Sequence, residues 1–194
     1  HRGSSAASDV YKRQLLIILG SIPLVIVGYI FYSTNLIDQF RNLKVVAWTT
    51  LIFGILLYFS DKFELKNKIS SELNIKSIII IGLFQILAII PGVSRSGIVI
   101  TASRFLKFDR VESSKIAFYL SIPALAGASV LGFKDVIDDQ INFDAIFIFS
   151  TSASFLFSYF TIKYFLIYVK MFSLSFFVIY RIVLSIILFS IIYL

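Results

Sequence analysis

Residues 91–97, with the sequence PGVSRSG, combine the residue types that a protein uses to bind an anion within an otherwise apolar stretch. Arg95 offers a planar guanidinium that can reach two phosphate oxygens at once, and Ser94 and Ser96 offer hydroxyl donors. A charge in the middle of a bilayer costs roughly 2.5–3.5 kcal/mol on insertion scales. Such a charge is tolerated where it lines a polar cavity, so we interpret this PGVSRSG segment as a binding site.

The backbone of the PGVSRSG segment supports the same interpretation. Pro91 lacks an amide hydrogen and breaks a helix, while Gly92 and Gly97 allow the backbone to approach a ligand closely. If a helix starts near residue 96, its free amides and partial positive charge point at the bound anion. The simpler alternative is a proline–glycine kink with the Arg95 side chain reaching toward the membrane surface.

Two further polar residues lie in apolar surroundings, and each has two interpretations. Gln85 lies about two turns before the PGVSRSG segment, where it faces the same cavity or forms a hydrogen bond between helices. Arg181 lies in the last apolar run, where it extends to the membrane surface or pairs with a buried polar group.

The composition indicates a helical membrane protein. Of 194 residues, 58% are hydrophobic and only 15% are charged, whereas soluble domains average about 25% charged residues. The mean hydropathy is +0.92. The apolar runs are long and lack the alternation of a β-barrel. The chain has no cysteine and its single histidine is His1, which excludes thiolate chemistry and a histidine-based metal site.

The apolar runs predict an all-α, polytopic fold with one membrane domain at 15–194, preceded by a non-native or disordered tail at 1–14. The predicted spans are 15–32, 45–59, 116–133, 143–168 and 174–194, together with a broken segment at 78–106. The net charge of +7 comes from basic residues in short loops, which indicates membrane topology rather than nucleic-acid binding.

Charge placement favours a broken segment that enters and leaves the membrane on one face. If 78–106 crossed as one span, the lysine-rich loop 61–76 and the basic stretch 104–115 would lie on opposite sides. If the segment turns back at residues 91–92, both basic regions lie inside and the acidic loop 134–142 lies outside. We therefore predict a re-entrant helix pair.

The string at 82–97 (GLFQILAIIPGVSRSG) resembles the second signature of the undecaprenyl-diphosphatase family of the bacitracin-resistance type. The likeness continues at 118–128 (FYLSIPALAGA), at 162–181, and upstream at Ser21-Ile22-Pro23 with Gly28, so it covers essentially 15–194. Residues 21–28 also resemble residues 121–127, a weak internal sequence similarity of the kind that a structural repeat produces.

The resemblance implies hydrolysis of undecaprenyl diphosphate to undecaprenyl phosphate and inorganic phosphate, which recycles the lipid carrier for peptidoglycan synthesis. It implies an inverted-repeat fold in the bacterial inner membrane, with the active site toward the periplasm. It places Arg95 and Ser94 in catalysis and Gly92, Ser96 and Gly97 in substrate binding, with Gln85 and Thr101 as further binding residues. The family often has a threonine where this chain has Val99, and many members have an acidic residue at the position of Lys115.

Members of this family also carry a first signature with two glutamates and a Ser-Ser-Thr-Gly-His run. Here no glutamate precedes Glu64 and no histidine follows His1. We therefore expect the chain to be an amino-terminally truncated part of a longer protein, with little phosphatase activity alone. Phosphate release by the purified chain would contradict this expectation.

The resemblance further implies a divalent cation, Mg²⁺ or Ca²⁺, whose ligands are not expected in this chain. The expected partners are the lipid substrate and the membrane, with no nucleic acid, and the sequence leaves a homo-oligomer open. A polyprenyl-phosphate flippase or an anion transporter is the alternative function, because broken helices and buried charges also occur in transporters.

Overall fold

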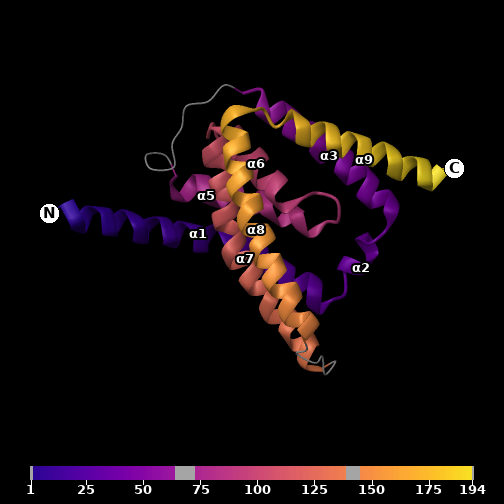
Figure 1. Cartoon of the computed structure of the whole chain (residues 1–194), viewed down its shortest axis with the longest axis horizontal. Helices are drawn as coiled ribbons and strands as arrows, with labels where there is room; N and C mark the ends of the chain where they lie inside the picture. The colour runs from indigo at the N-terminus through magenta and orange to yellow at the C-terminus, as the bar shows by residue number, and fades with distance from the viewer. Residues whose placement is uncertain (1, 64–72, 139–144, 194) are drawn as a thin grey trace.

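The computed structural model of the protein describes residues 2–63, 73–138 and 145–193, and within these ranges every regular element is a helix (Figure 1). In chain order the helices are α1 (Arg2–Ser33), α2 (Ile37–Phe40), α3 (Leu43–Asp61), α5 (Ile75–Ile86), a short 3₁₀ helix η1 (Leu87–Ile89), α6 (Arg95–Phe105), α7 (Arg110–Asp138), α8 (Ala145–Met171) and α9 (Ser175–Tyr193).

Four of the described helices are long and apolar enough to cross a membrane, namely Val10–Ser33, Leu43–Asp61, Ala145–Met171 and Ser175–Tyr193. The prediction of an all-α, polytopic membrane protein is therefore confirmed. The predicted span at 116–133 lies within α7, which is not among these four helices. The acidic loop predicted at 134–142, and most of the charged loop at 61–76, lie outside the residues whose side chains are described.

The backbone at residues 2–14 is the first part of α1 and is helical, whereas the sequence predicts a non-native or disordered tail at 1–14. Figure 1 shows this amino-terminal part of α1 projecting away from the other helices. The continuous apolar pattern starts near residue 15, and for that reason sequence reasoning places a boundary there.

α6 packs on α7, α3 and α5, and the remaining helices pack in three further associations. α3 lies along α9, α1 packs on α5 and α7, and α8 lies beside α7 (Figure 1). α8 places most of its large apolar side chains at the surface, and Val169 is its one buried residue among those described. This distribution fits a helix surrounded by lipid, where apolar side chains gain nothing from further burial.

α1 and α5 approach so closely that only glycine fits at the crossing. A Cβ atom on Gly82 would overlap the carbonyl oxygen of Gly20, and a Cβ atom on Gly20 would lie 2.6 Å from the Ile78 side chain. Small residues commonly permit such backbone contact between helices in membranes. This contact fixes α5 against α1 and therefore positions the segment that follows α5.

α5 and α6 form a hairpin, because they pack against each other and are joined by η1 and the PGVSRSG segment. The side chain of Asn74 caps the start of α5 by accepting a hydrogen bond from the amide of Ser77. The end of α6 lies beside the end of α3, where the rings of Phe63 and Phe105 are 5.8 Å apart. The chain thus turns back on itself between α5 and α6.

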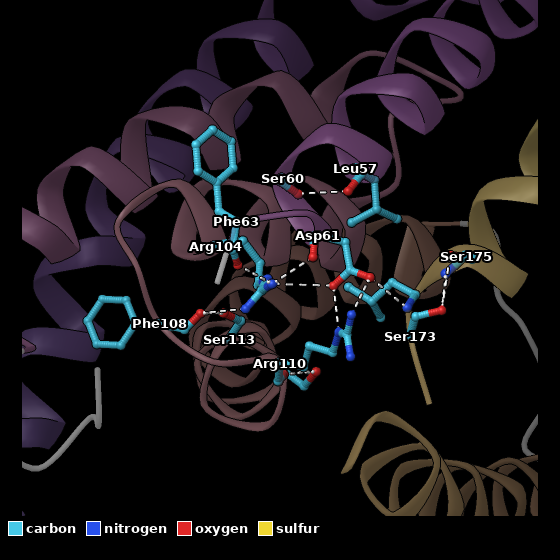
Figure 2. Close-up of polar contacts among 12 residues, drawn as sticks. Leu57, Ser60, Asp61, Phe63, Arg104, Phe108, Arg110, Ser113, Ser173 and Ser175 are labelled. Carbon is cyan, nitrogen blue, oxygen red and sulfur yellow. Dashed lines mark hydrogen bonds and ion pairs between the residues drawn. The ribbon is translucent and has the colours of Figure 1, made fainter. Parts of the chain in front are cut away.

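A buried carboxylate, Asp61, connects the ends of several helices (Figure 2). Its oxygens accept hydrogen bonds from Arg110 Nε at 2.6 Å, from Arg110 Nη2 at 3.0 Å and from the amide of Leu174 at 3.0 Å. Arg104 lies 3.5 Å from the same carboxylate and donates to the carbonyl oxygens of Asp61, Phe63 and Phe108. The contacts hold the end of α3, the end of α6, the start of α7 and the turn before α9 together.

We predict that Asp61→Asn destabilises the protein strongly. The side chains of Asp61 and Arg104 are only 7% and 5% exposed, and the removal of one partner leaves a buried charge uncompensated, which costs about 3–5 kcal/mol. The expected result is a clear fall in the midpoint of thermal unfolding in detergent.

Asp38→Asn is the matched control, because Asp38 pairs with Arg41 in a salt bridge in which both side chains are more than 60% exposed. Exposed pairs contribute about 0–1 kcal/mol, so this variant should unfold close to the wild-type midpoint. Equal midpoints for the two variants would refute the assigned role of Asp61.

Candidate functional site

The PGVSRSG segment is the break between α5 and α6. α5 ends at Ile86, η1 continues to Ile89, and Ile90 adopts an extended backbone with ψ 125°. A turn follows, in which the amide of Val93 donates to the carbonyl oxygen of Ile90 at 3.3 Å. Helical geometry resumes at Arg95. The sequence correctly predicts a helix broken within residues 91–97.

The carbonyl oxygens freed by the break are paired with side chains from α3 and α9. The hydroxyl of Thr49 lies 2.6 Å from the carbonyl oxygen of Pro91, its nearest acceptor, while the carbonyl oxygens of Val45 and Val46 in its own helix lie at 2.8 and 3.2 Å. The carbonyl oxygen of Gly92 accepts from Arg181 Nη2 at 2.9 Å and from the hydroxyl of Thr50 at 3.3 Å. Since an unpaired buried carbonyl group costs about 1–3 kcal/mol, these three side chains stabilise the shape of the break.

Gly92 occupies a position that other residues would not fit. Its φ of +90° lies in the left-handed region, and a Cβ atom there would overlap the hydroxyl oxygen of Thr49. The backbone therefore lies directly against α3, and this close approach brings its carbonyl oxygen to Thr50 and Arg181. The predicted need for glycine at this position thus has a packing reason as well as a conformational one.

Ser94 is the amino-terminal cap of α6. Its side-chain oxygen accepts a hydrogen bond from the amide of Gly97 at 3.3 Å, and its φ is +69°, an uncommon value for a residue other than glycine. Because the oxygen accepts from this amide, the hydroxyl hydrogen remains available to donate. Ser94 and Ser96 are both exposed in the described structure.

Arg95 is the first residue of α6 and has a half-buried side chain. Its only hydrogen bond among the described residues joins Nη1 to the carbonyl oxygen of Ser121 at 3.4 Å, which is long for such a bond. The backbone amides of Arg95 and Ser96 make no hydrogen bond with another described residue outside their own helix. The start of α6 therefore carries a guanidinium, two exposed hydroxyl groups and amides without a described partner on three consecutive residues, of which Arg95 lines the neighbouring cavity and Ser94 and Ser96 do not.

A cavity of about 790 Å³ extends from Arg95 between α1 and α7. Its lining is mainly apolar and includes Val25 and Gly28 of α1 and Ala124 and Gly127 of α7. The two stretches with similar sequence thus lie on adjacent helices and line one cavity, namely residues 21–28 and 121–127. A Cβ atom on Gly20 would contact Leu120 at 3.1 Å, and one on Gly127 would contact Val25 at 3.7 Å, so α1 and α7 run in the same direction.

Gln85 and Thr101 are placed apart from the exposed polar groups of the PGVSRSG segment. Gln85 is 0% exposed, does not line the cavity next to Arg95, and has no hydrogen-bond partner for either side-chain polar atom among the described residues. Thr101 is 1% exposed, and its hydroxyl donates to the carbonyl oxygen of Gly97 at 2.8 Å. Their predicted contacts with the substrate remain predictions.

Arg181 belongs to the site, although extension to the membrane surface is the interpretation that the sequence favours. Its side chain is 8% exposed, Nε donates to the carbonyl oxygen of Thr50 at 3.3 Å, and Nη1 lies 3.8 Å from the place of a Cβ atom on Gly97. Pairing with buried polar groups is therefore the correct alternative. The sequence analysis does not identify Thr49 and Thr50 as site residues, although two adjacent hydroxyl groups in an apolar span are a signal for contacts between helices.

The site is electropositive, because no carboxylate of the described residues forms a salt bridge with Arg95 or Arg181. The described residues also contain no cluster of three or more His, Cys, Asp or Glu that could hold a metal ion. Guanidinium and hydroxyl groups suit an anion, so these residues do not fit the divalent cation that the resemblance implies.

The two positions where the chain departs from the family pattern lie away from these exposed groups. Val99 is fully buried. Lys115 lies on α7 and bonds to Glu112 at 2.8 Å, and this hydrogen bond raises the pKa of Lys115. Neither side chain forms a hydrogen bond or an ion pair with the PGVSRSG segment in the described structure.

Comparison with known proteins gives concordant matches. The family model described as bacitracin resistance protein BacA matches residues 2–187, a range that starts within the predicted tail. The undecaprenyl-diphosphatase of Pelagibacter ubique (strain HTCC1062) is 59% identical over 183 residues, which cover 94% of this chain and 72% of that relative.

Two more distant relatives carry the same name. The undecaprenyl-diphosphatase of Elusimicrobium minutum (strain Pei191) is 42% identical over 89% of this chain and 65% of its own length. That of Thermobifida fusca (strain YX) is 34% identical over 91% of this chain and 60% of its own length. The chain thus spans between three fifths and three quarters of these relatives. With its broken helix, its electropositive PGVSRSG segment and a match over nearly its whole length, the chain belongs to the bacitracin resistance protein BacA family.

Proposed function

We propose that this chain acts in the hydrolysis of undecaprenyl diphosphate to undecaprenyl phosphate and inorganic phosphate, and that the PGVSRSG segment holds the diphosphate group. The observation that carries this proposal is that three consecutive residues at the start of α6 supply the Arg95 guanidinium, the exposed hydroxyls of Ser94 and Ser96, and backbone amides without a described partner. Its relatives named undecaprenyl-diphosphatase support the choice of reaction.

The geometry suits phosphoryl transfer, because that reaction depends mainly on positioning and on charge stabilisation. In a loose transition state the negative charge spreads over the phosphate oxygens. Arg95 would bind two of these oxygens, and the Ser94 and Ser96 hydroxyls would donate to the same group. The donors are held in place before the reaction by the cap of α6 and by the hydrogen bonds to the carbonyl groups of residues 91 and 92, so little reorganisation is required.

The apolar cavity beside Arg95 suits the lipid part of the substrate. It runs from the guanidinium between α1 and α7 and is lined mostly by apolar and small residues. A polyprenyl chain bound there would place its diphosphate at Arg95. A cavity that combines arginines, here Arg95 and Arg41, with mostly apolar walls distinguishes an amphiphile from a soluble phosphate ester.

The proposal assigns no proton transfer and no metal-bound step to the described residues. The divalent cation expected from the family resemblance stays a prediction, because the described residues supply no ligand cluster for it. A bound cation would supply further charge stabilisation to the diphosphate. Arg95 and its neighbours act by binding and orienting the anion.

The proposed location is the bacterial inner membrane, with the PGVSRSG segment reached from the periplasmic side. Basic residues surround the ends of α3, α6 and α8, as expected for a cytoplasmic surface. Thr49 and Asp61 are separated by twelve positions of α3, or about 18 Å at 1.5 Å per residue. The segment would therefore lie well within the roughly 30 Å of hydrocarbon and nearer to the periplasm.

Hydrolysis is best tested in a chimera in which this chain replaces the matching 183 residues of the Pelagibacter relative. Reconstituted in vesicles, the chimera should release inorganic phosphate from undecaprenyl diphosphate. Movement of intact lipid between leaflets without phosphate release would instead support the flippase alternative.

We predict that Arg95→Lys in this chimera lowers phosphate release by about 100-fold or more. Loss of one donor that stabilises developing charge typically costs a factor of about 10²–10³ in turnover, and lysine does not reproduce the planar fork of arginine. The measurement is the initial rate of phosphate release at saturating lipid. Arg41→Lys is the matched control, because Arg41 lines the same cavity but lies in an exposed salt bridge. A wild-type rate for Arg95→Lys would refute the assigned role.

We predict that Thr49→Val slows the same reaction about tenfold, while Thr49→Ser retains most of the activity. Valine keeps the size of the side chain but leaves the carbonyl oxygen of Pro91 without its partner, a loss of about 1–3 kcal/mol. The serine variant restores the hydroxyl and is the control for packing. Equal rates for the two variants would show that the hydrogen bond to Pro91 does not hold the segment in its active shape.

A further inference from the structure

A second pocket with basic residues lies at the far end of α6 from the PGVSRSG segment. It has a volume of about 830 Å³ and opens between the end of α3, the start of α7 and the turn between α8 and α9. Arg95 and Arg104 mark the two ends of α6 and are nine positions apart, about 14 Å along the helix. We call this second pocket the Lys170 pocket, after one of its lining residues. Because Arg104 lines the Lys170 pocket and Arg95 does not, the two sites are separate.

The Lys170 pocket carries an excess of positive charge. Its cationic side chains are Lys62, Arg104, Arg110 and Lys170, and its acidic side chains are Asp61 and Asp109.

Both carboxylates are already occupied. Asp61 accepts hydrogen bonds from Arg110 and from the amide of Leu174 (Figure 2). Asp109 accepts from the amide of Glu112 and so caps α7. The occupied carboxylates leave the lysines available for a ligand.

The two lysines are the cations that no described carboxylate pairs. Lys62 Nζ lies 4.6 Å from the centre of the Tyr58 ring, a contact that holds the lysine at the pocket without neutralising it. Lys170 is exposed at the end of α8 and forms no salt bridge with a described residue. An anion placed between them would meet two positive charges.

Neutral donors complete the polar side of the pocket. Ser173 and Ser175 line it, and their hydroxyl oxygens are 3.0 Å apart at the start of α9 (Figure 2). α9 has 19 residues, so the positive end of its dipole lies at the same place. The amides of Leu174 and Ser175 already donate to Asp61 and to the Ser173 hydroxyl oxygen, so the Ser175 hydroxyl and the lysines are the donors that suit phosphate oxygens here.

The other side of the pocket is apolar. Tyr58, Val111 and Val169 contribute to its wall. Among the chain neighbours of the lining residues, Phe59, Phe172 and Phe176 are 57%, 54% and 64% exposed. A soluble anion gains nothing from such a border, whereas the glycerol and acyl parts of a lipid would cover it.

We propose that the Lys170 pocket binds the phosphate group of an anionic membrane lipid, with Lys62 and Lys170 as its charged contacts. Basic pockets between membrane helices are suited to acidic headgroups, and each cation near an anionic surface contributes about 1 kcal/mol, or about fivefold in affinity. The site is independent of the proposed reaction, since it uses none of the residues of the PGVSRSG segment.

The test measures the binding of dioctanoyl phosphatidylglycerol to the purified chain in a neutral detergent, read as the rise in thermal unfolding midpoint with lipid concentration. The double variant K62Q/K170Q should need about 25-fold more of this lipid for the same rise, from about fivefold for each lysine removed. K62Q/K163Q is the matched control. Lys163 is exposed on the same helix as Lys170 but outside the pocket, so this variant should lose only about fivefold.

Two further ligands test which part of the lipid the Lys170 pocket recognises. Dioctanoyl phosphatidylcholine, whose phosphate is neutralised by choline, should raise the midpoint equally in all variants. If inorganic phosphate protects the wild type as well as phosphatidylglycerol does, the assignment to a lipid is wrong. If K62Q/K170Q binds phosphatidylglycerol as tightly as K62Q/K163Q, the pocket is not the site.

Discussion

The structure depends on how the protein pairs the carbonyl groups that a broken helix exposes in apolar surroundings. Away from water, each such group needs a partner from another part of the chain. The carbonyl oxygen of Pro91 has Thr49, and that of Gly92 has Thr50 and Arg181. These contacts connect the break to α3 and α9, which pack along each other. The anion-binding geometry at the start of α6 is therefore a property of three helices rather than of one loop.

The same helix, α3, fixes both ends of the α5–α6 hairpin. Thr49 contacts the tip, while Asp61, about 18 Å further along α3, holds Arg104 near the end of α6. The length of α3 between these contacts matches the length of α6. Contacts at both ends of the hairpin keep it from tilting, which a contact at one end alone would not do. Because both anchors are polar groups buried in a mostly apolar protein, displacement of the hairpin would leave several of them unpaired at once.

The sequence predicts the features that depend on local residue types. A proline, two glycines and a charge within an apolar run locate the break, and long apolar runs give the all-α class. The pairing of Arg181 with the Thr50 carbonyl could not be predicted, because the two residues are 131 positions apart. The positive φ of Ser94 also has no local signal, since serine rarely adopts it. Thr101, by contrast, makes a local contact, because its hydroxyl bonds to the carbonyl oxygen of Gly97 within its own helix.

The two arginines of the site differ in how many of their donors the protein uses. Arg181 directs Nε and Nη2 to carbonyl oxygens at 3.3 and 2.9 Å and is almost fully buried. Arg95 has one long contact of 3.4 Å and borders the large cavity. Arg95 therefore keeps more of its five N–H donors unused and borders a cavity, whereas Arg181 commits two of its donors to carbonyl oxygens and is less accessible to a ligand. Arg181 therefore shapes the segment and adds positive potential, and Arg95 is the arginine that an incoming phosphate would bind.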